Sequence, residues 1–62
     1  MMNNPWFMSL ATKEFYRSEF VKEMRGSLKD GHFTLLPSEA AKIVGDRWSV
    51  SPETVLLSLA PL

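Results

Sequence analysis

The side chains that could support catalysis or bind a metal are few in this 62-residue chain. It contains one histidine, His32, and no cysteine, which excludes disulfide bonds and thiolate metal ligands. A zinc site needs three further ligands besides one histidine, and no acidic cluster lies near His32 to supply them. No Gly-rich phosphate loop and no spacing of acids or serines resembles a catalytic signature. We therefore expect a protein that is not an enzyme and uses no cofactor or metal, with His32 as an exposed turn residue.

The aromatic residues indicate protein recognition instead. Tryptophan and arginine are over-represented among the residues that dominate binding energy at interfaces, and Arg47 directly precedes Trp48. Trp48 follows polar residues, so it either folds back as a lid over a small core or anchors a partner. Trp6 and Phe7 pose the same choice, because Met8 follows them and three bulky apolar residues in a row cannot all face one side of a helix.

The C-terminal segment adds apolar side chains that cover more than one face at helical spacing. They are Val55, Leu56, Leu57, Leu59 and Leu62. A chain of this length buries only about 60% of the surface that its unfolded form exposes, so we expect a second surface to cover this helix. That surface is either the same helix of a second copy, in a two-fold dimer, or a groove on a larger protein. The residues that we predict to contact a partner are Trp6, Phe7, Arg47, Trp48, Leu56 and Leu59.

The charged residues balance, since seven basic and seven acidic side chains give a net charge of zero at pH 7. A neutral chain has no electrostatic repulsion that would keep copies apart, which favours a homodimer. Most of the basic residues lie between positions 13 and 29, interleaved with glutamates. This mixture predicts a solvated helix face with i,i+3 ion pairs such as Glu14–Arg17 and Glu19–Lys22.

The segment 38–57 suggests a second function. It contains "AAKIVG" at positions 40–45 and "VSPETV" at positions 50–55, and together they resemble the helix-turn-helix of bacterial and phage regulators. In that family Ala41 would be the small residue where two helices cross, Gly45 the turn glycine, and Val50 and Val55 the apolar anchors. The residues "DRWS" between the two parts lengthen the turn relative to the family pattern.

The resemblance implies a dimeric DNA-binding transcriptional regulator, which is the alternative to a protein adaptor. DNA binding depends on cationic side chains at phosphates and on polar side chains at base edges. The second helix of the motif has no Lys or Arg from Val50 onward, which disfavours this alternative. The residues that we assign to nucleic acid under it are Arg17, Arg25, Lys29, Lys42, Arg47, Ser51 and Thr54.

Helix start and stop signals predict one long helix in the N-terminal half of the chain. Thr12 is a candidate N-cap and Gly26 a candidate left-handed end, which predicts an amphipathic helix from about Thr12 to Arg25. A short turn or helix, Pro5–Leu10, would precede it, because proline is favoured at the first helical position. One unbroken helix to Lys29 is the alternative.

Turn and cap signals organise the second half of the chain. Lys-Asp-Gly at positions 29–31 predicts a tight turn, followed by a brief strand or extended crossing over His32–Leu36. Ser38 is the predicted cap of the next helix, which Gly45 would end. Ser51 and Pro52 predict the start of a final helix that runs to about Leu59.

These signals together predict one small, mainly α-helical domain over residues 1–62, with three helices, a helix-turn-helix-like C-terminal pair and one short extended segment. No apolar run approaches the roughly 20 residues that span a bilayer, and the N-terminus lacks the basic region of a signal peptide. We therefore expect a cytoplasmic regulator or adaptor with no membrane contact, whose partner is another protein or a second copy of itself. Its size and style are frequent among phage and mobile-element products.

Overall fold

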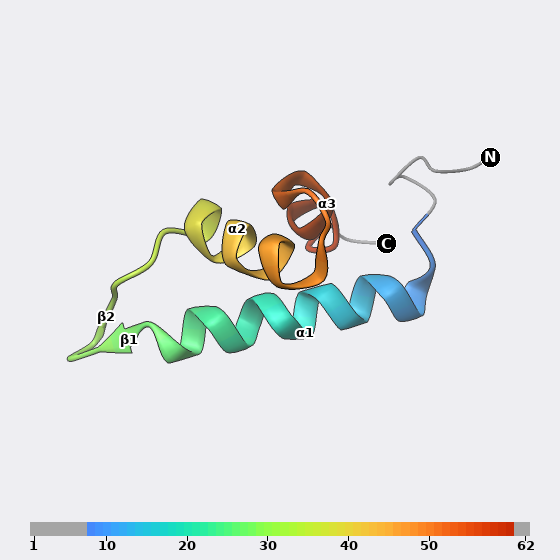
Figure 1. Cartoon of the computed structure of the whole chain (residues 1–62). Coiled ribbons are helices and arrows are strands. Elements are labelled where there is room, and N and C mark those ends of the chain that lie inside the picture. The colour runs from blue at the N-terminus through green and yellow to red at the C-terminus, as the bar shows by residue number, and fades with distance from the viewer. Residues whose placement is uncertain (1–7, 61–62) are drawn as a thin grey trace.

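The computed structural model describes residues 8–60 and is mainly helical, as predicted. Three helices and one short hairpin follow one another along the chain (Figure 1). In chain order the elements are α1 (Leu10–Gly26), β1 (Leu28–Lys29), β2 (His32–Phe33), α2 (Pro37–Trp48) and α3 (Pro52–Leu57). The predicted partner residues Trp6 and Phe7 and the first half of the segment Pro5–Leu10, predicted as a turn or helix, lie outside the described residues.

Helix α1 begins before the predicted cap, so the assignment of Thr12 as the N-cap is wrong. Ser9 is the N-cap: its backbone is extended, and its Oγ accepts a hydrogen bond from the backbone N–H of Thr12 at 3.1 Å. Leu10, predicted to end a separate helix, is the first residue of α1. Ser9 and Thr12 are equally suitable N-cap residues by type, and the helix starts at the earlier one.

The other end of α1 also differs from the prediction. Gly26 is the last helical residue and does not adopt a positive φ, so it is not a left-handed cap. Ser27 follows in a right-handed conformation, and its Oγ donates to the carbonyl oxygen of Met24 at 2.8 Å. The chain then enters the hairpin, so one helix unbroken to Lys29 is not formed.

The predicted turn is confirmed, and the segment predicted to be extended over His32–Leu36 forms a strand only at His32–Phe33. This strand pairs with Leu28–Lys29 in a two-stranded antiparallel hairpin. Asp30 and Gly31 both have positive φ, 52° and 80°, which a two-residue hairpin loop requires and which Asp-Gly readily adopts. The register pairs Leu28 with Phe33 and Lys29 with His32. The hairpin extends past the end of α1, away from α3 (Figure 1).

Helix α2 starts and ends at residues other than those predicted. Its N-cap is Leu36 rather than Ser38, and the backbone N–H of Leu36 donates to Glu39 Oε1 at 2.8 Å. It continues past Gly45 to Trp48, and Ser49 ends it in a left-handed conformation with a φ of 60°. Gly45 is therefore not a helix end.

The turn between α2 and α3 is short, not lengthened, because Asp46, Arg47 and Trp48 belong to α2. It consists of Ser49, Val50 and Ser51. Glycine at position 45 serves a different purpose from the predicted one, since a Cβ there would lie 2.6 Å from the carbonyl oxygen of Val50. The missing side chain lets the turn pass directly over the helix.

Helix α3 starts as predicted and ends earlier than predicted. Ser51 is its N-cap, with Oγ accepting from the backbone N–H of Thr54 at 3.3 Å, and Pro52 is the first helical residue. The helix ends at Leu57, with Ser58 as the C-cap, rather than at Leu59.

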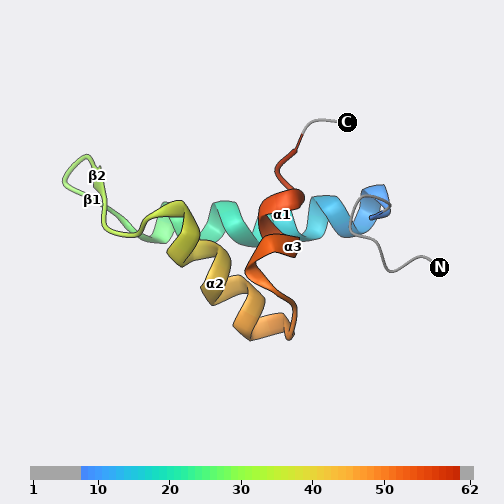
Figure 2. The ribbon, with the colours of Figure 1, turned by 90° about the horizontal axis from the view of Figure 1, so that it is seen from above.

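The core lies where the three helices meet. Ala41, Val44 and Val55 are buried, and Tyr16, Phe20 and Val50 pack against them. Helices α2 and α3 lie on the same side of α1, and Figure 2 shows α2 running obliquely to it. Among the elements of residues 8–60, none lies on the opposite side of α1 (Figure 1).

Candidate functional site

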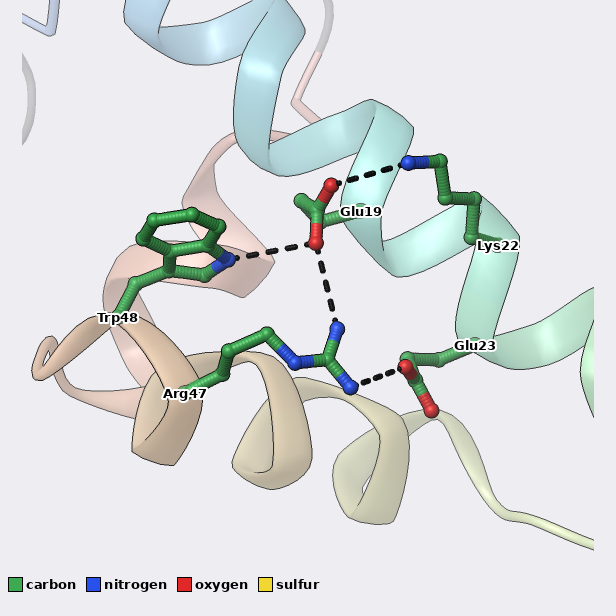
Figure 3. A network of polar contacts seen from close by, with 5 residues as sticks. All are labelled: Glu19, Lys22, Glu23, Arg47 and Trp48. Carbon is green, nitrogen blue, oxygen red and sulfur yellow. Dashed lines mark hydrogen bonds and ion pairs between the residues drawn. The ribbon is translucent and has the colours of Figure 1, made fainter.

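A polar network joins the end of α2 to the middle of α1 (Figure 3). Glu19 Oε1 accepts hydrogen bonds from Trp48 Nε1 at 3.3 Å and from Arg47 Nη1 at 3.2 Å. Glu19 Oε2 pairs with Lys22 Nζ at 3.3 Å, and Arg47 Nη2 pairs with Glu23 Oε2 at 2.7 Å. These five residues are called the Glu19 network below.

Glu19 is the buried charged residue of the described part of the chain, with 9% of its surface exposed. A carboxylate out of water is unfavourable unless both of its oxygens are paired, and here both are. The hydrogen bond from Trp48 lowers the pKa of Glu19 below its ordinary 4.5, as do Lys22 and Arg47, while burial opposes the shift. The carboxylate is therefore charged at neutral pH and can hold both α2 residues in place.

Trp48 folds back onto α1 and is also partly exposed. Its ring packs edge-on against Phe15, with ring centroids 4.9 Å apart and an interplanar angle of 77°. Even so, Trp48 is 45% exposed and Phe15 is 40% exposed. These two rings are called the Phe15–Trp48 surface. The packed side of Trp48 contacts Phe15 and Glu19 of α1. Its exposed side leaves the anchor interpretation as a proposal.

The other predicted partner residues have different environments. Arg47, predicted as a rim residue, is paired with Glu23 and Glu19, and these interactions raise its pKa above its ordinary value. Leu56 is 39% exposed, whereas Leu59 is half-buried. Arg47 lies on α2, Leu56 lies on α3, and Leu59 follows the end of α3.

The final helix needs less external cover than its sequence suggests. Val55 and Ser58 are fully buried, and Leu57 and Leu59 are half-buried, so the chain itself covers much of this segment. The reason is that α3 packs against both α2 and α1. Leu56 is the large apolar side chain of α3 that stays exposed.

Two of the three arginines assigned to nucleic acid, Arg17 and Arg47, are engaged within the chain. Arg17 donates through Nε to the carbonyl oxygen of Ser58 and through Nη2 to that of Ala60, both at 3.2 Å. A guanidinium is favourable at these carbonyls, because the C-terminal end of a helix carries partial negative charge. Arg17 therefore does not pair with Glu14 as predicted, whereas the predicted Glu19–Lys22 ion pair is confirmed.

The remaining residues of the nucleic-acid set are spread over several elements. Arg25 is near the end of α1, Lys29 is in the hairpin and Lys42 is on α2, and all three are exposed. Ser51 and Thr54 hydrogen-bond to one another through their hydroxyls at 3.0 Å, at the start of α3. Arg17 and Arg47 thus use their guanidinium groups to connect elements of the same chain.

Sequence reasoning missed the roles of Glu19 and Phe15. One signal was present: Glu19 lies between Tyr16 and Phe20 on the stripe that α1 turns toward α2 and α3, where a charge requires a partner. The nature of that partner was not visible, because Arg47 and Trp48 are 28 and 29 residues away.

Comparison with known proteins identifies no relative, since no protein family model, curated protein or solved structure matches the chain. Within residues 8–60, no three His, Asp or Glu side chains gather closely enough to hold a metal ion. No helix in the same part of the chain has the length and apolar character that crossing a membrane requires.

Acid is expected to weaken the fold through Glu19. Its pKa is lowered on folding, so its contribution to stability is fully present above its ordinary pKa of 4.5 and is lost as the pH falls through the folded value. In Glu19→Gln the free energy of unfolding should be lower at neutral pH and should change less below pH 4.5 than in the wild type. Urea unfolding followed by circular dichroism over a pH series measures both.

The matched control for this experiment is Glu53→Gln, because Glu53 is exposed on α3 and has no ion pair among the described contacts. It should keep the stability and the pH profile of the wild type. A Glu19→Gln variant with the wild-type profile would contradict the role given to this carboxylate.

Proposed function

We propose that this protein is a small non-enzymatic regulator or adaptor that binds another protein through the Phe15–Trp48 surface, with Leu56 as a further apolar contact. The observation that carries the proposal is the state of Trp48. Its one polar group, the indole N–H, is already bonded to Glu19, and nearly half of its surface faces solvent. A partner would therefore gain apolar contact area without having to satisfy a buried donor.

The Glu19 network supports this proposal by preparing the surface for binding. A tryptophan held by a hydrogen bond and by an aromatic neighbour has lost rotamer freedom before the partner arrives, which reduces the entropic cost of association. Tryptophan is also the residue type most enriched among interface hot spots. Arg47 would act as a positioning residue for this surface through Glu19 rather than as a contact at its rim.

A DNA-binding regulator of the helix-turn-helix class is the second candidate. The observation that favours it is the three-residue turn between α2 and α3, a length typical of that motif. The charge distribution disfavours it. Helix α3 carries no Lys or Arg, and Arg17 and Arg47 are paired within the chain.

Alanine substitution on the exposed apolar surface should abolish partner capture. We expect Trp48→Ala and Leu56→Ala, immobilised and incubated with a lysate of the cells that express the protein, to retain at least about tenfold less of the partner than the wild type, since hot-spot truncations cost 2 kcal/mol or more. Quantitative mass spectrometry of the retained proteins measures the loss. Lys42→Ala, on the exposed side of α2, is the control that should bind normally.

Circular dichroism of both variants must show a folded helical chain for the comparison to count. Undiminished capture by both folded variants would contradict the adaptor proposal. Titration of the wild type against a mixed duplex DNA at low and high salt separates the two candidates, because affinity carried by phosphate contacts falls steeply with salt. Tight, salt-sensitive DNA binding would favour the second candidate.

A further inference from the structure

The side of α1 that faces away from α2 and α3 carries a self-complementary row of exposed side chains. The row consists of Glu14, Ser18, Val21 and Arg25, and its steps are four, three and four residues. Steps of three and four residues place all four side chains on one face of the helix. No helix or strand of residues 8–60 covers this side in Figure 1.

The order of residues in the row matches a second copy in the opposite direction. Glu14 and Arg25 lie at equal distances on either side of the centre of the row, and so do Ser18 and Val21. A two-fold axis through that centre would place each Glu14 opposite Arg25 of the other copy, and each Ser18 opposite Val21. Every contact of such an interface forms twice, including the ion pair between Glu14 and Arg25.

A parallel arrangement of the same helices would be unfavourable. It would place Glu14 opposite Glu14 and Arg25 opposite Arg25, and like charges across an interface repel. The charges of the row therefore select one direction. The net charge of zero adds no overall repulsion between copies.

The two cations that flank the row are held by contacts within their own chain. Arg17 binds the carbonyl oxygens of Ser58 and Ala60, and Lys22 pairs with Glu19. A shallow hollow of about 470 Å³ lies along this side of α1, with room for side chains of an opposing helix. Its lining consists of Glu14, Arg17, Ser18, Val21, Lys22 and Arg25.

We propose that this row of α1 binds a second copy of the chain in an antiparallel, two-fold homodimer held by paired Glu14–Arg25 contacts. The row contains neither Phe15 nor Trp48, so the Phe15–Trp48 surface remains exposed on both copies. Dimerisation and partner binding are therefore separable, and either can fail without the other.

Charge reversal tests the proposal directly. Sedimentation velocity of the full chain over a range of concentrations should show a dimer in the wild type. Glu14→Arg and Arg25→Glu should each weaken it by at least about tenfold, because both symmetric ion pairs become repulsive. The double variant Glu14→Arg/Arg25→Glu exchanges the two charges and should restore the wild-type dissociation constant to within about threefold, the scatter expected of surface ion pairs.

Two controls make the same change of charge outside the row. Glu53→Arg on α3 and Lys42→Glu on α2 are exposed and should leave the dimer unchanged. A wild type that stays monomeric at all concentrations would overturn the proposal. So would single reversals that leave the dimer intact, or a folded double variant that is no more dimeric than the single ones.

Cysteine cross-linking provides a second test that does not depend on charge. The chain contains no cysteine, so Ser18→Cys and Val21→Cys each introduce a single thiol. Mixed and oxidised, the two variants should form a disulfide between one copy of each far more readily than either variant forms it alone, because only the mixed pair places the thiols opposite one another. Equal cross-linking in all three samples would contradict the antiparallel register.

Discussion

The Gly45→Ala variant should lose most of the stability of the fold. A Cβ at this position would lie 2.6 Å from the carbonyl oxygen of Val50 and 3.4 Å from the backbone nitrogen of Pro52. Both are backbone atoms, so no side chain can rotate away, and the turn itself would have to move. Moving it displaces α3 and with it the buried Val55. We expect a loss of about 3 kcal/mol, the upper part of the range for overpacked interiors.

Gly26→Ala is the matched control for this change. Position 26 is helical without a positive φ, and no atom lies within 4 Å of an added Cβ. Alanine there should stabilise the chain by roughly 0.5–1 kcal/mol, because it restricts the unfolded state and favours the helix. Urea unfolding followed by circular dichroism compares the two variants. Equal stability of Gly45→Ala and the wild type would contradict the close passage of the turn over α2.

The second large effect is expected at Val55, the apolar residue by which α3 joins the core. Its side chain is fully buried against Ala41 and Val44. Val55→Ala removes two methyl groups from this contact and leaves a cavity that the short α3 cannot close without shifting. We expect a cost of about 2–3 kcal/mol, combining the transfer and cavity contributions. In a domain of this size that is a large share of the total stability.

The neighbouring Leu56→Ala variant provides the comparison. It removes a larger side chain, yet Leu56 is 39% exposed. The substitution should therefore lower the free energy of unfolding by only about 1 kcal/mol or less, as is usual for surface positions. The order of the two effects is therefore opposite to the order of side-chain size. Thermal and urea unfolding of both variants measure it. A Leu56→Ala variant as unstable as Val55→Ala would show that α3 presents a different face to the core.

The two variants also connect stability to the proposed function. Leu56→Ala should remain folded while it loses partner capture, whereas Val55→Ala loses capture only through unfolding. The same logic applies to the Glu19 network. Glu19→Gln leaves Trp48 on the surface but replaces the charged acceptor of its indole N–H with a neutral amide oxygen, which accepts a weaker hydrogen bond. Weaker binding by a folded Glu19→Gln variant would therefore indicate that the orientation of Trp48, rather than its exposed area alone, determines affinity.

Local signals in the sequence determined the elements that depend on neighbouring residues alone. Asp30 and Gly31 predicted the hairpin turn because few other residue pairs adopt positive φ at both positions. Ser51 and Pro52 predicted the start of α3, since a serine oxygen caps the N–H three residues later. The Glu19–Lys22 ion pair was predictable for the same reason, as its partners share one helix face.

Tertiary packing decided what local chemistry left open. Gly45 has the residue type of a helix end, yet α2 continues past it. The glycine is needed instead because the returning chain at Val50 occupies the space that a side chain would fill. Arg17 and Arg47 look like free cations in the sequence, but each finds its partner between 24 and 43 residues away. Such contacts depend on how α1, α2 and α3 cross, and that crossing follows from burial of apolar surface rather than from any short motif.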